Sequence, residues 1–185
     1  MGFINGTHVL SGSSYEQYDN IAGLHVGQSM SHFVPATGST AWTTGSSAVT
    51  HTGSYSVSKV ITITTENGYT IKCGEDTPFL TKDESQFTHP DSGSCSTGVG
   101  IDTFWVTPAG GQPNIADELS GRILSGSTSS RPYSDCYLLQ MPRKNWVKVT
   151  AISSSAESAS LFSYKTDSSA TNLVDGFVAH SSIEW

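Results

Sequence analysis

The most constraining feature of the sequence is an alternating, β-branched stretch that runs directly into a tight turn. Residues 60–64 read Val-Ile-Thr-Ile-Thr, in which apolar and polar side chains alternate with the period of a half-buried strand. Glu66-Asn67-Gly68 follows, and Asn-Gly pairs favour hairpin turns because they accept positive φ. Residues 69–73 predict a second strand that returns antiparallel to the first. The fold must therefore be built around a β-hairpin over residues 60–73.

The composition favours a weakly charged, β-rich globular protein. A length of 185 residues suggests one domain, with room for an insertion. Serine is the commonest residue type, glycine adds 18 residues, and charged residues make up only 14% of the chain, which is typical of turns and short strands. The net charge of −7, with nine scattered basic residues, argues against a nucleic-acid partner. No apolar run is long enough to span a membrane and the start does not resemble a signal peptide. We therefore expect no membrane partner and a cytoplasmic or virion location.

Other segments carry weaker structural signals. Residues 36–54 are rich in Ser, Thr and Gly and predict a loop or an exposed hairpin. Residues 114–124 are the only fair helix candidate, because their apolar side chains recur roughly on one helical face. Further strands are predicted within residues 2–10, 19–30, 101–106 and 133–140.

The cysteines and histidines give no clear metal or disulfide site. Cys73, Cys95 and Cys136 do not form a disulfide framework, and we expect them to be reduced and at least partly buried. A zinc site from His89, Cys95 and Cys136 is an alternative, but its spacing matches no common ligand pattern and structural zinc normally takes four ligands. We expect no metal and no cofactor. Three other histidines stand in polar surroundings and are predicted to lie on the surface: His25, His32 and His51.

Three segments together carry a family resemblance. They are Gly2-Phe3-Ile4-Asn5-Gly6-Thr7-His8-Val9-Leu10, then residues 64–80 ending in Gly74-Glu75-Asp76-Thr77-Pro78-Phe79-Leu80, and Val174-Asp175-Gly176-Phe177-Val178-Ala179-His180-Ser181. In this order and spacing they resemble the Hint family, the self-processing domains of inteins, bacterial intein-like domains and hedgehog proteins.

The resemblance implies an all-β fold, a flattened Hint-like horseshoe with a mixed insertion. Residues 1–80 and 146–185 would form the β core and residues 81–145 an insertion within it. The three segments would then meet at the centre of the horseshoe. An unrelated β-rich binding protein, whose motifs match by chance, would instead place them far apart.

The resemblance also implies that the positions of the chemistry have changed. Hint chemistry begins with an N-terminal Cys or Ser nucleophile, where this chain has Gly2. A Thr-x-x-His motif then assists as acid and base, but Gly74 and Thr77 stand at those positions, and a Thr hydroxyl does not titrate near neutral pH. The final His-Asn pair is His180-Ser181 here, and Ser cannot cyclise as Asn does.

These changes favour a degenerate Hint-like domain that is not an enzyme, with no catalytic residue expected at any of the five positions. Such a domain would act as a structural or assembly module, oligomeric or particle-bound through other protein subunits, for example in a phage tail or baseplate. The alternative is a self-processing domain, active in protein splicing or autocleavage, with an altered or engineered active site.

Overall fold

The computed structural model describes residues 1–12, 17–34, 43–83, 103–106, 108, 136–169 and 171–180. Their strands form one 14-stranded sheet in the order β3-β2-β13-β14-β8-β10-β11-β6-β7-β1-β12-β5-β4, with β9 paired to β8 beside this path. The elements are β1 (Phe3–Ile4), β2 (His8–Leu10), β3 (Tyr18–Asn20), the 3-10 helix η1 (Ile21–Gly23), β4 (Ser29–Val34), β5 (Thr43–Val57), β6 (Val60–Thr65), β7 (Thr70–Cys73), β8 (Phe79–Asp83), β9 (Thr103–Val106), β10 (Cys136–Gln140), β11 (Asn145–Ser155), β12 (Ala159–Thr166), β13 (Thr171–Val174) and β14 (Phe177–His180).

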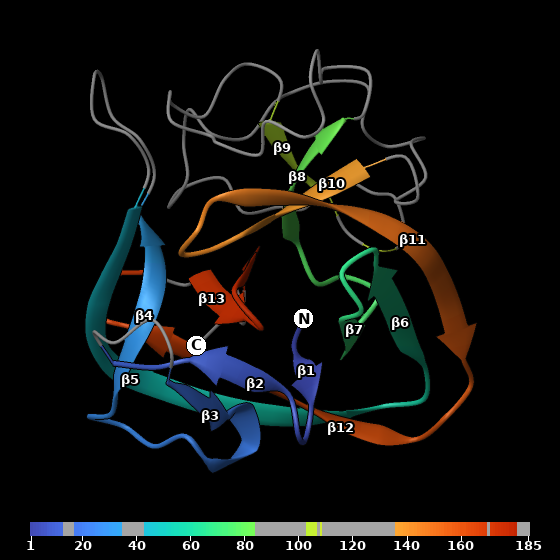
Figure 1. The fold of residues 1–185 in the computed structure, drawn as a ribbon. Helices are drawn as coiled ribbons and strands as arrows, with labels where there is room; N and C mark the ends of the chain where they lie inside the picture. The colour runs from blue at the N-terminus through green and yellow to red at the C-terminus, as the bar shows by residue number, and fades with distance from the viewer. Residues whose placement is uncertain are drawn as a thin grey trace.

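The sheet is bent around its own short strands. In Figure 1 the long strands β5, β12, β6 and β11 curve round the outside, and the short strands β1, β7 and β13 lie within the curve. The predicted all-β fold class is confirmed. Within the described parts of the chain, no helix is long and apolar enough to cross a membrane.

The hairpin predicted over residues 60–73 is confirmed as β6 and β7, which pair antiparallel. Its turn differs from the expected Asn-Gly geometry, because only Gly68 takes a positive φ, of 88°. The Gly68 N–H donates to the Thr65 carbonyl over 3.1 Å. The Thr65 hydroxyl donates to Asn67 Oδ1 at 2.6 Å and accepts from the Tyr69 N–H at 3.2 Å. Loops of this kind place one glycine in the left-handed region after an ordinary turn.

The Ser- and Gly-rich residues 36–54 do not form a simple loop. From residue 43 onward they belong to β5, a 15-residue strand. Residues 43–48 of β5 pair with β4, and residues 49–57 pair with β12. The hairpin alternative was therefore the better prediction, and β5 links two parts of the sheet.

Part of the sheet is packed on both faces. Phe79 of β8 and Leu138 of β10 belong to one buried hydrophobic cluster, while their chain neighbours Leu80 and Leu139 belong to a second. Successive side chains of a strand point to opposite faces, so two clusters on neighbouring residues mean two covered faces. This packing on both faces explains why all four residues are buried in each of the strands β13 and β14.

The region 81–145 is described only in part. The strands predicted within residues 101–106 and 133–140 are confirmed over 103–106 and 136–140. The helix candidate over 114–124 lies outside the described residues. Strand β10 pairs with β8 and β11, and at its last residue with β14. The division into a core and an insertion at 81 and 145 stays a prediction.

The turn between β13 and β14 requires glycine at position 176 for two reasons, its positive φ and the lack of space for a side chain. Gly176 has φ of 84°, and a Cβ placed on it would run into the Met141 carbonyl oxygen. We expect Gly176→Ala to lower the free energy of unfolding by about 2–5 kcal/mol, from the left-handed backbone and the overpacked contact together. Urea unfolding followed by circular dichroism measures the loss.

Gly68→Ala provides the matched control. Gly68 has φ of 88°, but a Cβ there meets nothing within 4 Å. Its substitution should cost only the backbone strain, about 1–2 kcal/mol. Equal losses in the two variants would show that the close approach to Met141 does not contribute.

Candidate functional site

The three segments singled out in the sequence meet at the centre of the sheet. Phe3 of β1 is opposite Cys73, the last residue of β7. Ala179 of β14 is opposite Phe79, the first residue of β8. The connection between β7 and β8, residues 74–78, therefore lies between the N-terminal strand and the last strand. The unrelated-protein alternative, which required these segments to lie far apart, is not supported.

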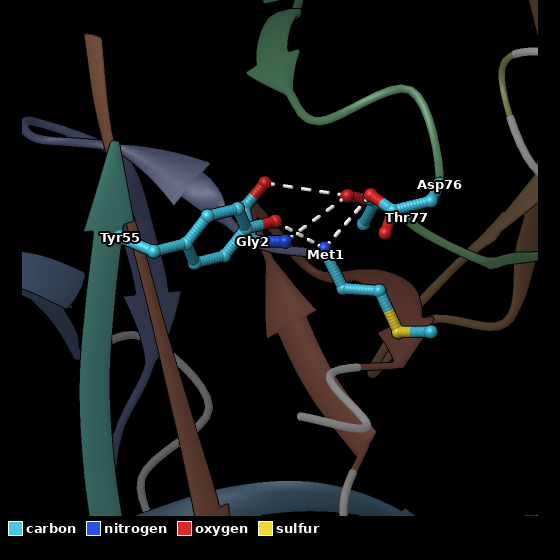
Figure 2. Close-up of polar contacts among 5 residues, drawn as sticks. All are labelled: Met1, Gly2, Tyr55, Asp76 and Thr77. Atoms are coloured by element: carbon cyan, nitrogen blue, oxygen red, sulfur yellow. Dashed lines mark hydrogen bonds and ion pairs between the residues drawn. The ribbon is translucent and has the colours of Figure 1, made fainter. Parts of the chain in front are cut away.

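Thr77 holds the backbone of Gly2 at two points, as Figure 2 shows. The Gly2 N–H donates to Thr77 Oγ1 at 3.1 Å, and the Thr77 hydroxyl donates to the Gly2 carbonyl oxygen at 3.3 Å. The Gly74 N–H donates to the same carbonyl oxygen at 3.0 Å. Thr77 is fully buried. Thr77, which the resemblance aligns with the family's histidine, therefore satisfies the backbone polar groups of Gly2, which it aligns with the family's nucleophile.

The backbone at Gly2 is closed to other residues. Its φ is 137°, and a Cβ built on it would lie 2.8 Å from the Phe162 carbonyl oxygen, which is backbone and cannot turn aside. At Gly74 a Cβ would meet Leu161 Cδ1 at 2.9 Å and Asp76 Oδ1 at 3.0 Å, both of them side-chain atoms that can move. A nucleophilic side chain at position 2 thus requires a shift of strand β12 or of β1, whereas position 74 is more tolerant.

His180, which the resemblance aligns with the family's terminal histidine, is almost completely buried, with 1% of its surface exposed. Its backbone N–H donates to the Pro78 carbonyl oxygen at 3.0 Å, so β14 is joined to the residue that follows Thr77. Of the five family positions, the structure brings together Gly2, Gly74, Thr77 and His180. Ser181 lies outside the described residues.

Two further side chains, Tyr55 and Asp76, complete the surroundings of Gly2. The Met1 nitrogen contacts the Tyr55 hydroxyl and lies 2.8 Å from Asp76 Oδ1 (Figure 2). Burial, and then the nearby Asp76 carboxylate, raise the pKa of the Tyr55 phenol above its ordinary value. Tyr55 lies near the end of β5, just after residues 36–54, which were predicted as a loop or an exposed hairpin, so no sequence signal pointed to it.

An open cavity of about 380 Å³ lies beside this arrangement. It is lined by Tyr55, by Lys59 and by the connection residues 74–76. Lys59 Nζ is 2.7 Å from Glu75 Oε2, and both side chains are about half exposed. Glu75 and Asp76 are therefore both surface carboxylates: Glu75 pairs with Lys59, and Asp76 lies next to the Met1 nitrogen.

Cys73 is the one cysteine whose side chain the structure describes, and it is free and fully buried, as predicted. Burial raises the pKa of its thiol to about 12, against a smaller lowering by the N-terminal charge and by a hydrogen bond with Thr77. The thiol is therefore protonated near neutral pH, and a protonated thiol is a poor nucleophile. Its position near Gly2 therefore does not make Cys73 a candidate nucleophile.

His32 was wrongly predicted to lie on the surface, although His25 and His51 are exposed as expected. It is buried in β4, with its Nδ1 3.2 Å from the Ser47 hydroxyl. Burial lowers the pKa of its imidazole, and the Asp167 carboxylate acts against this shift. The Ser and Gly residues near His32 in the sequence suggested a polar surface segment. In the structure, Gly45 of β5 is opposite His32 and lets the strand approach closely, since a Cβ on Gly45 would lie 2.8 Å from the imidazole.

The zinc alternative receives no support. His89 and Cys95 lie outside the described residues, and of Cys136 only the strand placement in β10 is described. Within the described ranges, no group of three or more His, Cys, Asp and Glu side chains stands close enough to hold a metal ion.

The hydrogen bonds of Thr77 make a testable contribution to stability. Thr77→Val keeps the size and branching of the side chain but leaves the buried Gly2 N–H without its acceptor, which should cost about 1–3 kcal/mol. Thr62→Val, at a partly exposed threonine of β6, is the matched control and should change stability little. Denaturant unfolding compares the two variants, and equal stability would mean that the hydroxyl is not needed to hold Gly2.

Comparisons with known proteins agree with this arrangement. No family model and no curated protein matches the sequence. Among solved structures, the bacterial intein-like domain from Clostridium thermocellum aligns over 98% of both chains with a TM-score of 0.63 and 18% identity. The TvoVMA intein aligns over 98% of both chains with a TM-score of 0.62 and 9% identity. The gp41-1 intein aligns over 97% of this chain and 98% of its own, with a TM-score of 0.56 and 13% identity. At sequence identities this low, structural similarity shows that the proteins share a fold. This chain has the Hint fold of inteins and intein-like domains.

Proposed function

We propose that this chain is a catalytically degenerate Hint domain that acts as a structural or assembly module. The observation that carries the proposal is the closed backbone at Gly2. Self-processing requires a nucleophilic side chain at this position, beside a group that can transfer a proton. Here the position has no side chain, and its N–H and carbonyl oxygen are both taken by Thr77.

The second support is that the substitutions fit one another. Glycine allows the φ of 137° at position 2 and the close approach to the Phe162 carbonyl oxygen. Threonine at position 77 is short enough to bond to both polar groups of Gly2 while fully buried. An engineered inactivation would change one or two residues and would leave the rest of the site in its catalytic form, whereas these residues form a satisfied interior.

A self-processing domain with altered chemistry is the second candidate. The observation in its favour is the buried His180, which keeps its family position and is joined through Pro78 to the segment that carries Thr77. Its imidazole would have to act with a nucleophile other than Gly2. The buried, protonated Cys73 is unsuited to that role.

The partners that we propose are other protein subunits, and the setting is the cytoplasm or a virion, for example a phage tail or baseplate. The composition supports this part of the proposal, since the chain is rich in Ser and Gly, weakly charged and acidic overall. Function depends on particular sites rather than on the fold itself. A domain that catalyses no reaction must therefore act by binding other molecules at its surface.

Intact-mass spectrometry of the chain with a folded tag fused at each end tests for self-processing. We expect the full-length mass to persist on incubation with and without a thiol, because no side chain at position 2 can attack the preceding carbonyl. A product cut or joined at residue 2 or after His180 would overturn the proposal. Thr77→Val in the same fusion is the control: a contaminating protease would cut it equally, whereas cleavage that depends on the site would change.

Co-sedimentation tests the assembly role. In a density gradient of material from the native source, detected by mass spectrometry, the chain should migrate with a large protein particle rather than at its own size. Migration as a free monomer of 19.6 kDa would overturn the assembly proposal while leaving the result of the cleavage test unaffected.

A further inference from the structure

A second cavity lies away from the Gly2 site, where several turns come together. Its volume is about 540 Å³, within the range of about 300–1,000 Å³ that is usual for small-molecule sites. Its lining comes from strand β3, from the turn between β6 and β7, and from the turn between β10 and β11. The lining side chains that matter for recognition are Tyr18, Asn67, Tyr69, Gln140, Arg143 and Asn145.

The cavity is held in shape by contacts behind its lining. The Tyr69 ring packs edge-on against buried Phe177, with 5.7 Å between ring centroids. The Met141 N–H donates to the Gly176 carbonyl oxygen at 2.7 Å, at the place where Gly176 has no room for a side chain. The turn between β13 and β14 thus supports the floor of the cavity, and the tyrosine ring is fixed rather than free.

Two carboxamides of the lining are fixed in a row. Asn67 Nδ2 donates to Gln140 Oε1 at 2.9 Å, and Gln140 Nε2 donates to the Asp175 carbonyl oxygen at 2.8 Å. The Thr65 hydroxyl fixes the other side of the row by donating to Asn67 Oδ1. A carboxamide has two N–H donors and an oxygen with two lone pairs, so both side chains keep a donor and an acceptor site for a ligand. Groups fixed in this way lose little freedom on binding.

The chemistry of the lining indicates an uncharged ligand rich in hydroxyl groups. A hydroxyl both donates and accepts, as carboxamides do, and Asn67, Gln140 and Asn145 supply three of these. Tyr18 and Tyr69 are each more than a third exposed and present an aromatic face for the apolar side of a ring. Among the lining residues that the structure describes, Arg143 is the only one with a charged side chain.

We propose that this cavity binds a pyranose ring of a carbohydrate. One ring face would lie on a tyrosine, while the hydroxyls at the ring edge would bond to the carboxamide row and to Arg143. Burial, and then the neighbouring Tyr69 and Asp175, raise the pKa of the Tyr18 phenol, so it stays protonated and able to donate. The proposal is independent of the processing chemistry, because none of these residues contacts Gly2 or Thr77 in the interactions described above.

Saturation-transfer NMR on the full chain tests the proposal. The probes are glucose, galactose, mannose, N-acetylglucosamine and the β-1,4-linked disaccharides of glucose and N-acetylglucosamine, each at millimolar concentration. We expect transfer to the ring protons of at least one probe. Arg143→Ala and Tyr18→Ala, both at exposed positions, should weaken binding of that probe by about tenfold or more, the fold-change expected from losing one good contact.

Tyr55→Ala is the matched control, since Tyr55 is also about one-third exposed but lies in the other cavity. It should bind the probe as the unchanged chain does, and circular dichroism should show that all three variants are folded. Absence of transfer from every probe would overturn the proposal, as would equal binding by all variants. A third outcome would also overturn the proposal. If the unchanged chain binds no sugar and Arg143→Ala no longer co-sediments with a protein particle, the cavity binds a protein partner instead.

Discussion

Strand β1, with only two residues, is the constraint on which the rest of the structure depends. Phe3 pairs with Cys73 of β7 on one side and with Phe162 of β12 on the other, so a single residue joins two parts of the sheet. Its ring is fully buried and meets Phe79 edge-on, with 6.1 Å between centroids. Because Gly2 directly precedes this residue, its position is fixed from both sides. A backbone held so closely leaves no space for a Cβ, and glycine follows from the geometry.

The elements that could be predicted from the sequence are those whose pattern is local. The hairpin of β6 and β7 carries β-branched alternation and a turn glycine within residues 60–73, and each signal acts over a few residues. Strand β5 carries a weaker signal, since glycines interrupt it and its pairing with β12 comes from a distant part of the chain. His32 was misjudged for the same reason: its burial depends on how closely β5 approaches, which the residues around it do not reveal.

The candidate site shows the same division. The order of three short segments was enough to predict that Gly2, Gly74, Thr77 and His180 would come together, because a fold fixes where its framework positions meet. Through the family resemblance, the identity of the residues also predicted which of the family's chemical groups are missing. It did not indicate that Thr77 would bond to both polar groups of Gly2, since that depends on backbone positions at the level of a few tenths of an ångström. A position that reads as a simple loss in the sequence takes part, in the structure, in a set of hydrogen bonds with the backbone of Gly2.

The buried centre of the sheet and the cavity at the turns differ in how their polar groups are satisfied, and this difference bears on where the molecule can act. At the centre, the buried N–H of Gly2 and hydroxyl of Thr77 bond to one another, so a ligand would have to displace a hydrogen bond that is already made. At the turns, the carboxamides of Asn67 and Gln140 use only part of their bonding capacity on each other and leave the remainder facing the cavity. A scaffold held rigid by a satisfied centre can present such a row of polar groups without losing stability, because the residues of a surface turn carry little of the core packing. The centre of this fold is therefore suited to holding the sheet together, and recognition is more readily placed at its turns.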